Sequence, residues 1–195
     1  MLDILVFDDA FDKKIVDSLE KLLLGNEFPW FFNLQSVYGE FPYDPSIHPK
    51  IPNNCKESYQ FTHSFFDSNQ GASVMFEKIQ QLLIKFPVKV DSVFRIKANL
   101  KTYVKEMEDS FCLPHVDFSD VKNLITAIYY VNDATGDTII YNEKIGNIGD
   151  LTAKQTISPK KGRLIVFDGA YYHAGNSPKD DNPRVIINFN FGIND

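Results

Sequence analysis

The stretch "RVIINFNFG", residues 184–192, decides the fold class of this 195-residue chain. Successive side chains of a β-strand point to opposite faces, so the stretch separates into two sets of residues. One set is wholly apolar, whereas the other is mostly polar and contains Arg184, Ile186, Asn188 and Asn190. We therefore expect a strand that packs into a core on one side and lines a wet cavity on the other.

Similar runs of β-type residues fill the chain from residue 93 onward, and Gly, Asn, Asp and Pro between them supply turns. Short strands in such number predict a mainly β protein with a double-stranded β-helix core of the jelly-roll or cupin-like type, spanning 93–195. The expected strands are "VFRIKANL" (93–100), "LPHVDF" (113–118), "LITAIYYV" (124–131), "DTIIYN" (137–142), "KQTIS" (154–158), "RLIVFD" (163–168), "AYYHA" (170–174) and "RVIINFNFG" (184–192).

The first part of the chain, residues 1–92, predicts helices and a loop that pack on this core. Apolar residues recur at helical spacing over 12–24 and over 73–86. Residues 58–66, "SYQFTHSFF", indicate a strand. The proline- and aromatic-rich segment 28–59 has no clean period, and it predicts either a cleft wall or lid, or an ordered loop that seals the core edge.

The bulk composition limits the classes of partner. A length of 195 residues suits a single domain, 1–195, and a hydrophobic content of 44% is ample for its core. The net charge of −6 weighs against binding of long nucleic acid, because contact with phosphates needs clustered Lys and Arg. A nucleotide held in a small pocket stays compatible with this charge.

Cysteine usage and hydropathy indicate the compartment. Cys55 and Cys112 have no metal-binding or redox spacing, so we expect reduced thiols, with a single disulfide as the alternative. The N-terminal apolar run is too short for a signal peptide, and no apolar stretch approaches the ~20 residues of a membrane span. We expect a soluble, cytoplasmic protein with no membrane partner and leave its oligomeric state open.

The segment "CLPHVDFSD", residues 112–120, carries the first indication of chemistry. In an extended segment His115 and Asp117 point to the same face, whereas Val116 points into the packing. His173, in "DGAYYHAGNSP", supplies a third ligand 58 residues after His115. Two histidines and one carboxylate on one face of a metal leave positions open, as in the facial triad of non-haem Fe(II) oxygenases.

Two further residues are candidates for binding a carboxylate. Arg184 would stand at the mouth of the cavity, and its guanidinium can bind both oxygens of a carboxylate. The alternative for Arg184 is a salt bridge at the rim of the sheet. Tyr130, in "LITAIYYVND", would assist from the next strand if its face points inward. The alternative for Tyr130 is a core tyrosine that donates to a backbone carbonyl.

The remaining histidines and one aspartate have structural interpretations. His48 and His63 have no suitably spaced partner, so we expect both to be structural, with a place at the substrate entrance as the alternative for His63. Asp168 is either a turn residue, which we favour, or an acceptor that orients His173.

The ordered set of these segments resembles the Fe(II)/2-oxoglutarate-dependent dioxygenases. Within them the chain is most similar to the prolyl-4-hydroxylase-like branch, including its small bacterial and phage members. The similarity covers about residues 93–192, roughly half of the chain, and residues 1–92 resemble the family's N-terminal helices only loosely. The matching elements, in the family's order, are "HVD" (115–117), "TAIYYVND" (126–133), "PKKGRLIVFDG" (159–169), "YHAG" (172–175) and "RVIINFNF" (184–191).

The resemblance implies a role for each matching residue. His115, Asp117 and His173 would hold Fe(II), while Arg184 would bind the far carboxylate of 2-oxoglutarate, assisted by Tyr130. Weaker candidates for contact with 2-oxoglutarate are Asn188 and Asn99. Asn190 stands where some members carry a bulky aromatic residue, so the pocket would have a different shape.

The resemblance also implies the reaction: 2-oxoglutarate and O₂ are consumed, succinate and CO₂ are released, and an unactivated C–H bond is hydroxylated. Ascorbate is a further candidate cofactor. The substrate stays open between peptidyl proline, a free amino acid, another protein and a small metabolite. Two rival functions are a zinc hydrolase with the same three ligands, and a non-catalytic jelly-roll module that binds sugar or serves in a virion.

Overall fold

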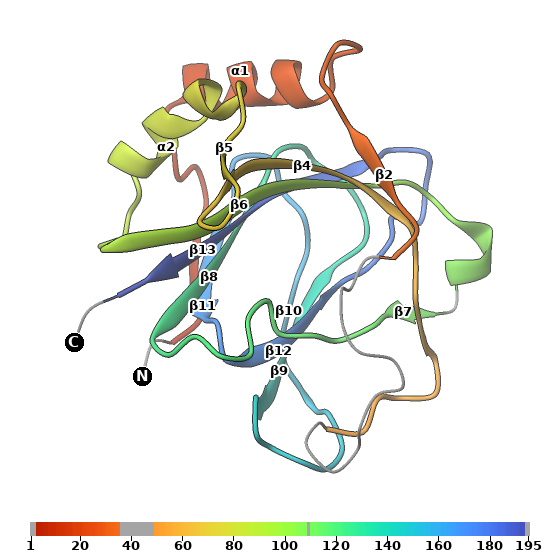
Figure 1. The fold of residues 1–195 in the computed structure, drawn as a ribbon. Helices are drawn as coiled ribbons and strands as arrows, with labels where there is room; N and C mark the ends of the chain where they lie inside the picture. Colours follow the sequence, from red (N-terminus) through yellow and green to blue (C-terminus); the bar gives the residue numbers. More distant parts are fainter. Residues whose placement is uncertain (1–2, 36–48, 109, 194–195) are drawn as a thin grey trace.

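The chain was examined as a computed structural model, which describes residues 3–35, 49–108 and 110–193. Two sheets face each other, and the short helices lie over the outer face of the larger sheet (Figure 1). The larger sheet is antiparallel and eight-stranded within the described residues. Its strands are, in spatial order, β1 (Leu5–Phe7), β11 (Leu164–Asp168), β8 (Leu124–Tyr130), β13 (Arg184–Gly192), β6 (Ser92–Lys101), β4 (Gln60–Asp67) and β2 (Phe31–Asn33), with β5 (Gly71–Ala72) paired to β4.

The smaller sheet carries the other wall of the interior. Its strands are β10 (Ala153–Ile157), β9 (Thr138–Lys144) and β12 (Tyr171–Gly175), in that order. His115 extends this sheet by a single antiparallel bridge to His173 on β12. Nearby, β7 (Phe111–Cys112) pairs in parallel with β3 (Cys55–Lys56), so part of the aromatic-rich segment lies next to the strand that precedes His115.

Two apolar clusters occupy the two faces of the larger sheet. One cluster lies beneath the helices and includes Leu19 of α1 (Lys13–Leu23) and Leu82 of α2 (Gln80–Ile84). The other lies between the sheets and joins Ile128 of β8 and Ile186 of β13 to Ile140 of β9. The expected alternation of β13 is confirmed, because its apolar face packs in the first cluster and its polar face points between the sheets.

Most of the predicted strands form, but the prediction of a strand over 113–118 is wrong. In this segment only His115 pairs, through the two 2.9 Å hydrogen bonds that it exchanges with the backbone of His173. Pro114 has no N–H to donate to a ladder, which limits pairing before His115. His115 and Asp117 therefore stand on an irregular segment that is held only at His115, whereas His173 belongs to β12.

The prediction of one helix over 73–86 is also wrong. The structure has the 3₁₀ turn η1 (Phe76–Lys78) followed by the short α2. Ile79 and Leu82 are buried there, and Met75, Phe76, Leu83 and Phe86 pack partly buried against the same cluster. The backbone N–H of Ser73 donates to the carbonyl of Phe65 on β4 at 2.9 Å, so the start of the expected helix is held to the sheet instead. The α1 helix, in contrast, confirms the prediction over 12–24 to within one residue at each end. A second 3₁₀ turn, η2 (Lys105–Met107), follows β6.

The N-terminal part contributes more than helices and a loop. The strands β1, β2, β4 and β5 all join the larger sheet, although only β4 was expected. β1 and β2 have three residues each, and β5 has two, too short for a recognisable alternation. Both cysteines are free, as expected. Among the described residues there is no helix with the length and apolarity that crossing a bilayer requires.

The packing under the helices generates a stability prediction. Phe189 is fully buried, and its ring centroid lies 5.3 Å from that of Phe86 and 5.6 Å from that of Phe191. Phe189→Ala should lower the free energy of unfolding by about 3–5 kcal/mol, because it removes apolar burial and leaves a cavity. Urea unfolding measures this change. Val74→Ala is the control, since Val74 is 91% exposed and its loss should cost less than about 0.5 kcal/mol. Equal costs for the two variants would contradict this placement of β13.

Candidate metal centre

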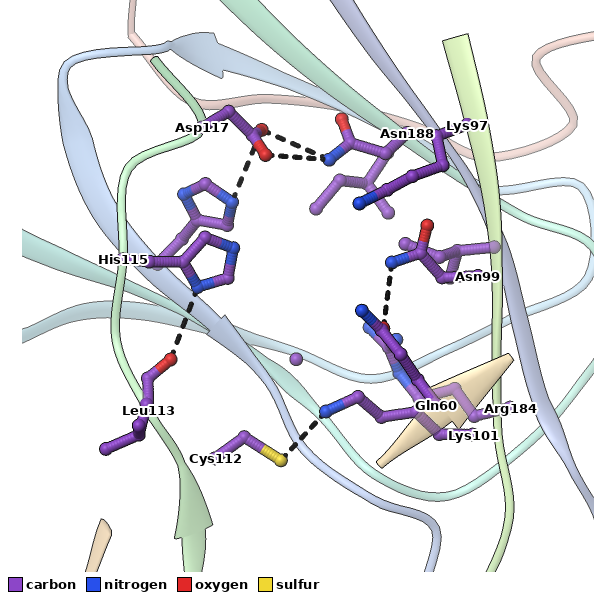
Figure 2. A pocket seen from close by; sticks show the side chains of 14 residues that line it. Gln60, Lys97, Asn99, Lys101, Cys112, Leu113, His115, Asp117, Arg184 and Asn188 are labelled. Atoms are coloured by element: carbon purple, nitrogen blue, oxygen red, sulfur yellow. Dashed lines mark hydrogen bonds and ion pairs between the residues drawn. The ribbon is translucent and has the colours of Figure 1, made fainter. Parts of the chain in front are cut away.

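The three ligand candidates predicted from the sequence lie together (Figure 2). The backbone bridge between His115 and His173 places their rings side by side, with centroids 4.6 Å apart. Asp117 follows two residues later and turns its carboxylate toward them. One ligand atom from each residue lies within 4.8 Å of the other two. The backbone pairing of His115 with β12 thus brings together two histidines that are 58 residues apart in the sequence.

The hydrogen bonds of the two histidines select the nitrogen that is available to a metal. Nδ1 of His115 lies 3.2 Å from the carbonyl oxygen of Leu113, and Nδ1 of His173 lies 3.3 Å from that of Tyr171. A carbonyl oxygen only accepts, so each Nδ1 must donate, and each Nε2 keeps its lone pair. Nε2 of His173 lies 3.7 Å from a carboxylate oxygen of Asp117.

Burial keeps His115 in the form that can bind a metal. Desolvation, followed by the proximity of His173, lowers the pKa of His115 to about 3. The ring is therefore neutral near pH 7, as a ligand nitrogen requires.

Four donors surround the Asp117 carboxylate. Nη2 of Arg95 lies 2.5 Å from Oδ1, and Nδ2 of Asn190 lies 2.9 Å from Oδ2. Nδ2 of Asn188 contacts both oxygens, at 3.3 and 3.1 Å, and the hydroxyl of Thr126 lies at 3.5 Å. Burial alone would raise the pKa of Asp117, but Arg95, the two histidines and Asn190 together hold it well below its usual range. The carboxylate is thus ionised and fixed in orientation.

A pocket lined by fourteen residues extends from the three ligands into the space between the sheets (Figure 2). At one end His115 and Lys97 are half-buried, although the side chain of Asp117 is only 5% exposed. The other end is closed, since Arg184 is 3% exposed and Lys101 6% exposed there. The pocket therefore opens beside the ligands and ends at the two cations.

Arg184 at the closed end is a buried cation that has no carboxylate partner in the described ranges. Nε donates to the carbonyl of Gly136 and Nη2 to the hydroxyl of Thr138, both at 2.7 Å. No carboxylate of a described residue lies within ion-pair distance of this guanidinium. Burial lowers the pKa of Arg184 from its ordinary value. The sequence-based alternative, a salt bridge at the rim, does not fit this position.

Lys101 is a residue of this pocket that the sequence analysis missed. It stands directly across the β6–β13 ladder from Arg184, and its Nζ lies 3.0 Å from Sγ of Cys112. Two like charges in directly opposed positions destabilise a sheet. An anion bound between Lys101 and Arg184 would remove this repulsion, so the closed end is suited to a carboxylate.

The other three predicted site residues occupy different places. Tyr130 is absent from the pocket lining, and its hydroxyl donates to Thr138 at 2.7 Å, the same oxygen that accepts from Arg184. Asn188 and Asn99 both line the pocket. Nδ2 of Asn99 donates to Gln60 at 3.0 Å. The direct contact of Tyr130 with a cosubstrate stays a prediction, since its described contact is with the partner of Arg184.

The structural interpretations of His63 and Asp168 are confirmed. His63 is buried, and its ring nitrogens contact the carbonyl of Pro29 at 2.9 Å and the hydroxyl of Ser73 at 3.1 Å. Asp168 is a turn residue, because its carboxylate accepts from the backbone of Ala170 and pairs with a lysine rather than orienting His173. His48 lies outside the described residues.

The comparisons with known proteins agree with this geometry. A family model described as "2OG-Fe(II) oxygenase superfamily" matches residues 99–192. These residues contain all three ligands, Arg184 and most of the pocket. Residues 99–192, just under half of the chain, are thus similar to the 2OG-Fe(II) oxygenase superfamily. Fe(II) and 2-oxoglutarate are the cofactors of the superfamily, and the two imidazoles, the carboxylate and the buried cation of this site fit them.

Solved structures share the fold at low sequence identity. A 2OG-Fe(II) oxygenase family oxidoreductase from Burkholderia pseudomallei matches with a TM-score of 0.62 at 15% identity, over 98% of this chain and 86% of that one. A prolyl-4-hydroxylase from Pseudomonas putida matches with a TM-score of 0.54 at 14% identity, over 98% and 92%. HygX from Streptomyces hygroscopicus, with nickel and 2-oxoglutarate bound, matches with a TM-score of 0.55 at 15% identity, over 97% and 82%. The search of curated proteins gave no match.

The lowered pKa of His115 predicts a pH dependence of stability. The folded value of about 3 lies below the ordinary 6.5, so the unfolded chain binds a proton that the folded chain excludes. The free energy of unfolding is therefore unaffected by the titration of His115 above pH 6.5. It falls as the pH is lowered from 6.5 toward 3, by at most about 1.4 kcal/mol per pH unit. Urea unfolding of metal-free protein at pH 6.5, 5.5 and 4.5 should show a steeper loss for wild type than for His115→Gln. Parallel losses would contradict the assignment.

The close approach of Gly175 to Arg184 yields a second prediction. A Cβ at Gly175 would lie 3.1 Å from both Nη1 and Nη2 of Arg184, whose other contacts hold it in place. Gly175→Ala should therefore displace the guanidinium and weaken 2-oxoglutarate binding about tenfold, a loss of roughly 1.4 kcal/mol. Mn(II) affinity, measured on the same sample by calorimetry, should stay unchanged. An unchanged affinity for 2-oxoglutarate would show that Arg184 is not its anchor.

Proposed function

We propose that this chain is an Fe(II)- and 2-oxoglutarate-dependent dioxygenase that hydroxylates an unactivated C–H bond. One observation carries the proposal: a single pocket joins three convergent metal ligands to a buried arginine that has no carboxylate partner among the described residues. The strands from β6 to β13 are divided between two facing sheets, and this supports a double-stranded β-helix as the framework. We take 1–195 as one domain.

Nε2 of His115, Nε2 of His173 and the carboxylate of Asp117 would hold the metal. Bound Fe(II) supplies the oxidising chemistry, in which one oxygen atom of O₂ enters succinate and the other enters the C–H bond, with release of CO₂. The protein's contribution is to fix the ligands before the metal arrives. Arg95, Asn188 and Asn190 hold the carboxylate, and two backbone carbonyls hold the imidazoles.

Arg184 and Lys101 would bind the far carboxylate of 2-oxoglutarate at the closed end. Both are buried, so a charge-assisted hydrogen bond there is not screened by solvent as a surface pair is. Thr138 holds one nitrogen of Arg184 in place. The apolar side chains of Ile128 and Ile186 line the pocket between the two ends and limit its access to water. Tyr130 would act through Thr138, as a positioning residue.

The rival functions leave parts of this site without a role. A zinc hydrolase needs a general base beside the metal water, but Asp117 is the one carboxylate among the residues that line the pocket, and it belongs to the ligand set. A non-catalytic binding module would not require the fixed nitrogens of His115 and His173. Neither rival uses the paired cations Arg184 and Lys101.

Two of the four substrate classes that the sequence left open are retained in this proposal. The prolyl-4-hydroxylase-like branch, supported by the fold shared with the Pseudomonas putida prolyl-4-hydroxylase, favours peptidyl proline. The alternative is an amino-acid-like small molecule.

Anaerobic titration with Fe(II) and then 2-oxoglutarate tests the cofactor site. The visible metal-to-ligand charge-transfer band should appear only when both are present. Asp117→Ala should abolish the band because it removes a ligand, and Arg184→Ala should demand at least about tenfold more 2-oxoglutarate, because it removes a charge-assisted contact.

Arg163→Ala is the matched control for this titration. Its guanidinium pairs with Asp8 at 2.7 Å and does not line the pocket, so its titration should follow wild type. The absence of any band in the wild-type protein would reject the oxygenase function.

A further inference from the structure

The inner face of β6 carries four polar residues, one of which has no partner within the described part of the chain. Three of them are engaged: Arg95 contacts Asp117, Asn99 contacts Gln60, and Lys101 contacts Cys112. Lys97 lines the pocket, but its ammonium makes no hydrogen bond or ion pair with the part of the chain that the structure describes. A half-buried ammonium without a partner is costly, so the position indicates a ligand.

A second unpaired group stands directly opposite. Asn188 on β13 is the cross-strand neighbour of Lys97, and it is 5% exposed. Its Nδ2 must face Asp117, since a carboxylate only accepts, so the orientation of the amide is determined. Its Oδ1 is buried and has no hydrogen-bond partner among the described residues. An unpaired donor and an unpaired acceptor thus stand together in the lining.

This pair lies at the metal end of the pocket. Figure 2 shows Lys97 and Asn188 beside Asp117, whereas Arg184, Lys101 and Gln60 lie at the other end. Lys97 is half-buried, in contrast to the buried cations of the closed end. A molecule that enters after 2-oxoglutarate would therefore meet Lys97, while the far carboxylate of 2-oxoglutarate would meet Arg184.

The charges of the pocket favour an anion at Lys97. Lys97, Lys101 and Arg184 are cations of the lining, and the one lining carboxylate, Asp117, is already paired with Arg95. A divalent metal adds positive charge, and the two carboxylates of 2-oxoglutarate do not neutralise the total. A further anion would reduce the remaining positive charge of the pocket. The attraction would be strong because the site is enclosed and of low polarity. Burial and the charge of Arg95 lower the pKa of Lys97 to about 8, which leaves it mostly protonated at pH 7.

We propose that Lys97 binds a carboxylate of the primary substrate, with Asn188 Oδ1 accepting from a donor on the same molecule. The substrate class is then a small acid with a neighbouring N–H or O–H group, such as a free amino acid, and not an internal proline of a peptide. This inference rests on the proposed function, and it places Lys97 on the substrate and not on the cosubstrate.

The test compares wild type with Lys97→Met, which keeps the length of the side chain and removes its charge. Lys14→Met is the control, since Lys14 is exposed on α1. With Mn(II) and saturating 2-oxoglutarate bound, thermal unfolding is followed with added acetate or added inorganic phosphate. Acetate should raise the Tm of wild type and Lys14→Met but not of Lys97→Met. Stabilisation by phosphate alone, or equal stabilisation of Lys97→Met by acetate, would overturn the proposal.

A turnover assay identifies the substrate class directly. Free amino acids and their matched carboxamides, together with prolyl peptides blocked at both ends, are screened for stimulated release of succinate from 2-oxoglutarate. At least one acid should stimulate succinate release by wild type, whereas its amide should not. For Lys97→Met the KM for that acid should rise tenfold or more. A response to blocked peptides or amides that Lys97→Met retains would overturn the proposal.

The charge-transfer titration separates this inference from the proposed function. Lys97→Met should bind Fe(II) and 2-oxoglutarate with affinities within about threefold of those of wild type, because the ammonium of Lys97 is proposed to contact the substrate and not the cosubstrate. A tenfold loss of 2-oxoglutarate affinity would assign Lys97 to the cosubstrate and overturn the proposal. Absence of the band in wild type would instead reject the oxygenase itself, whatever Lys97 does.

Discussion

The antiparallel register between β6 and β13 is the constraint on which the pocket depends. It sets Lys101 opposite Arg184, Lys97 opposite Asn188 and Arg95 opposite Asn190, all on one face. The intervening pairs, Ala98 with Ile187 and Ile96 with Phe189, build the core under the helices. A slip of one residue would exchange the two sets. The burial of the apolar set thus enforces the position of every charged group that faces the ligands.

The same register distributes charge unevenly along the pocket. At the metal end the Asp117 carboxylate is compensated by Arg95 and by neutral donors, so it is stable before a metal binds. At the closed end Arg184 and Lys101 face each other without an anion from the described residues. An anion bound between these two cations would pair with both of them, so binding of a dicarboxylate there would also stabilise the fold.

Sequence reasoning recovered most strands of the core and the three residues that cluster, His115, Asp117 and His173, because both depend on local patterns. Alternation identifies β8 and β13, and the H-x-D pair with a distant histidine is recognisable by residue type. It missed Arg95, Lys97 and Lys101, although "RIKANLK" (95–101) alternates polar and apolar residues as clearly as "RVIINFNF" does. Such alternation equally describes a strand whose polar face meets water. Only the pairing of β6 with β13 shows that this polar face is enclosed. The irregular segment around His115 could not be predicted either. It pairs through a single bridge, and one paired residue produces no periodic pattern of apolar and polar residues in the sequence.

The depth of the pocket links the two proposals through an order of events. The cations suited to the far carboxylate lie at the closed end, and Lys97 lies beside the metal ligands near the opening. A substrate held by Lys97 would stand between the solvent and the closed end. With these two sites, 2-oxoglutarate would enter before the substrate, and succinate would leave after the product. Two carboxylate sites arranged in this way would avoid competition, because the inner site would be reached only through the outer one.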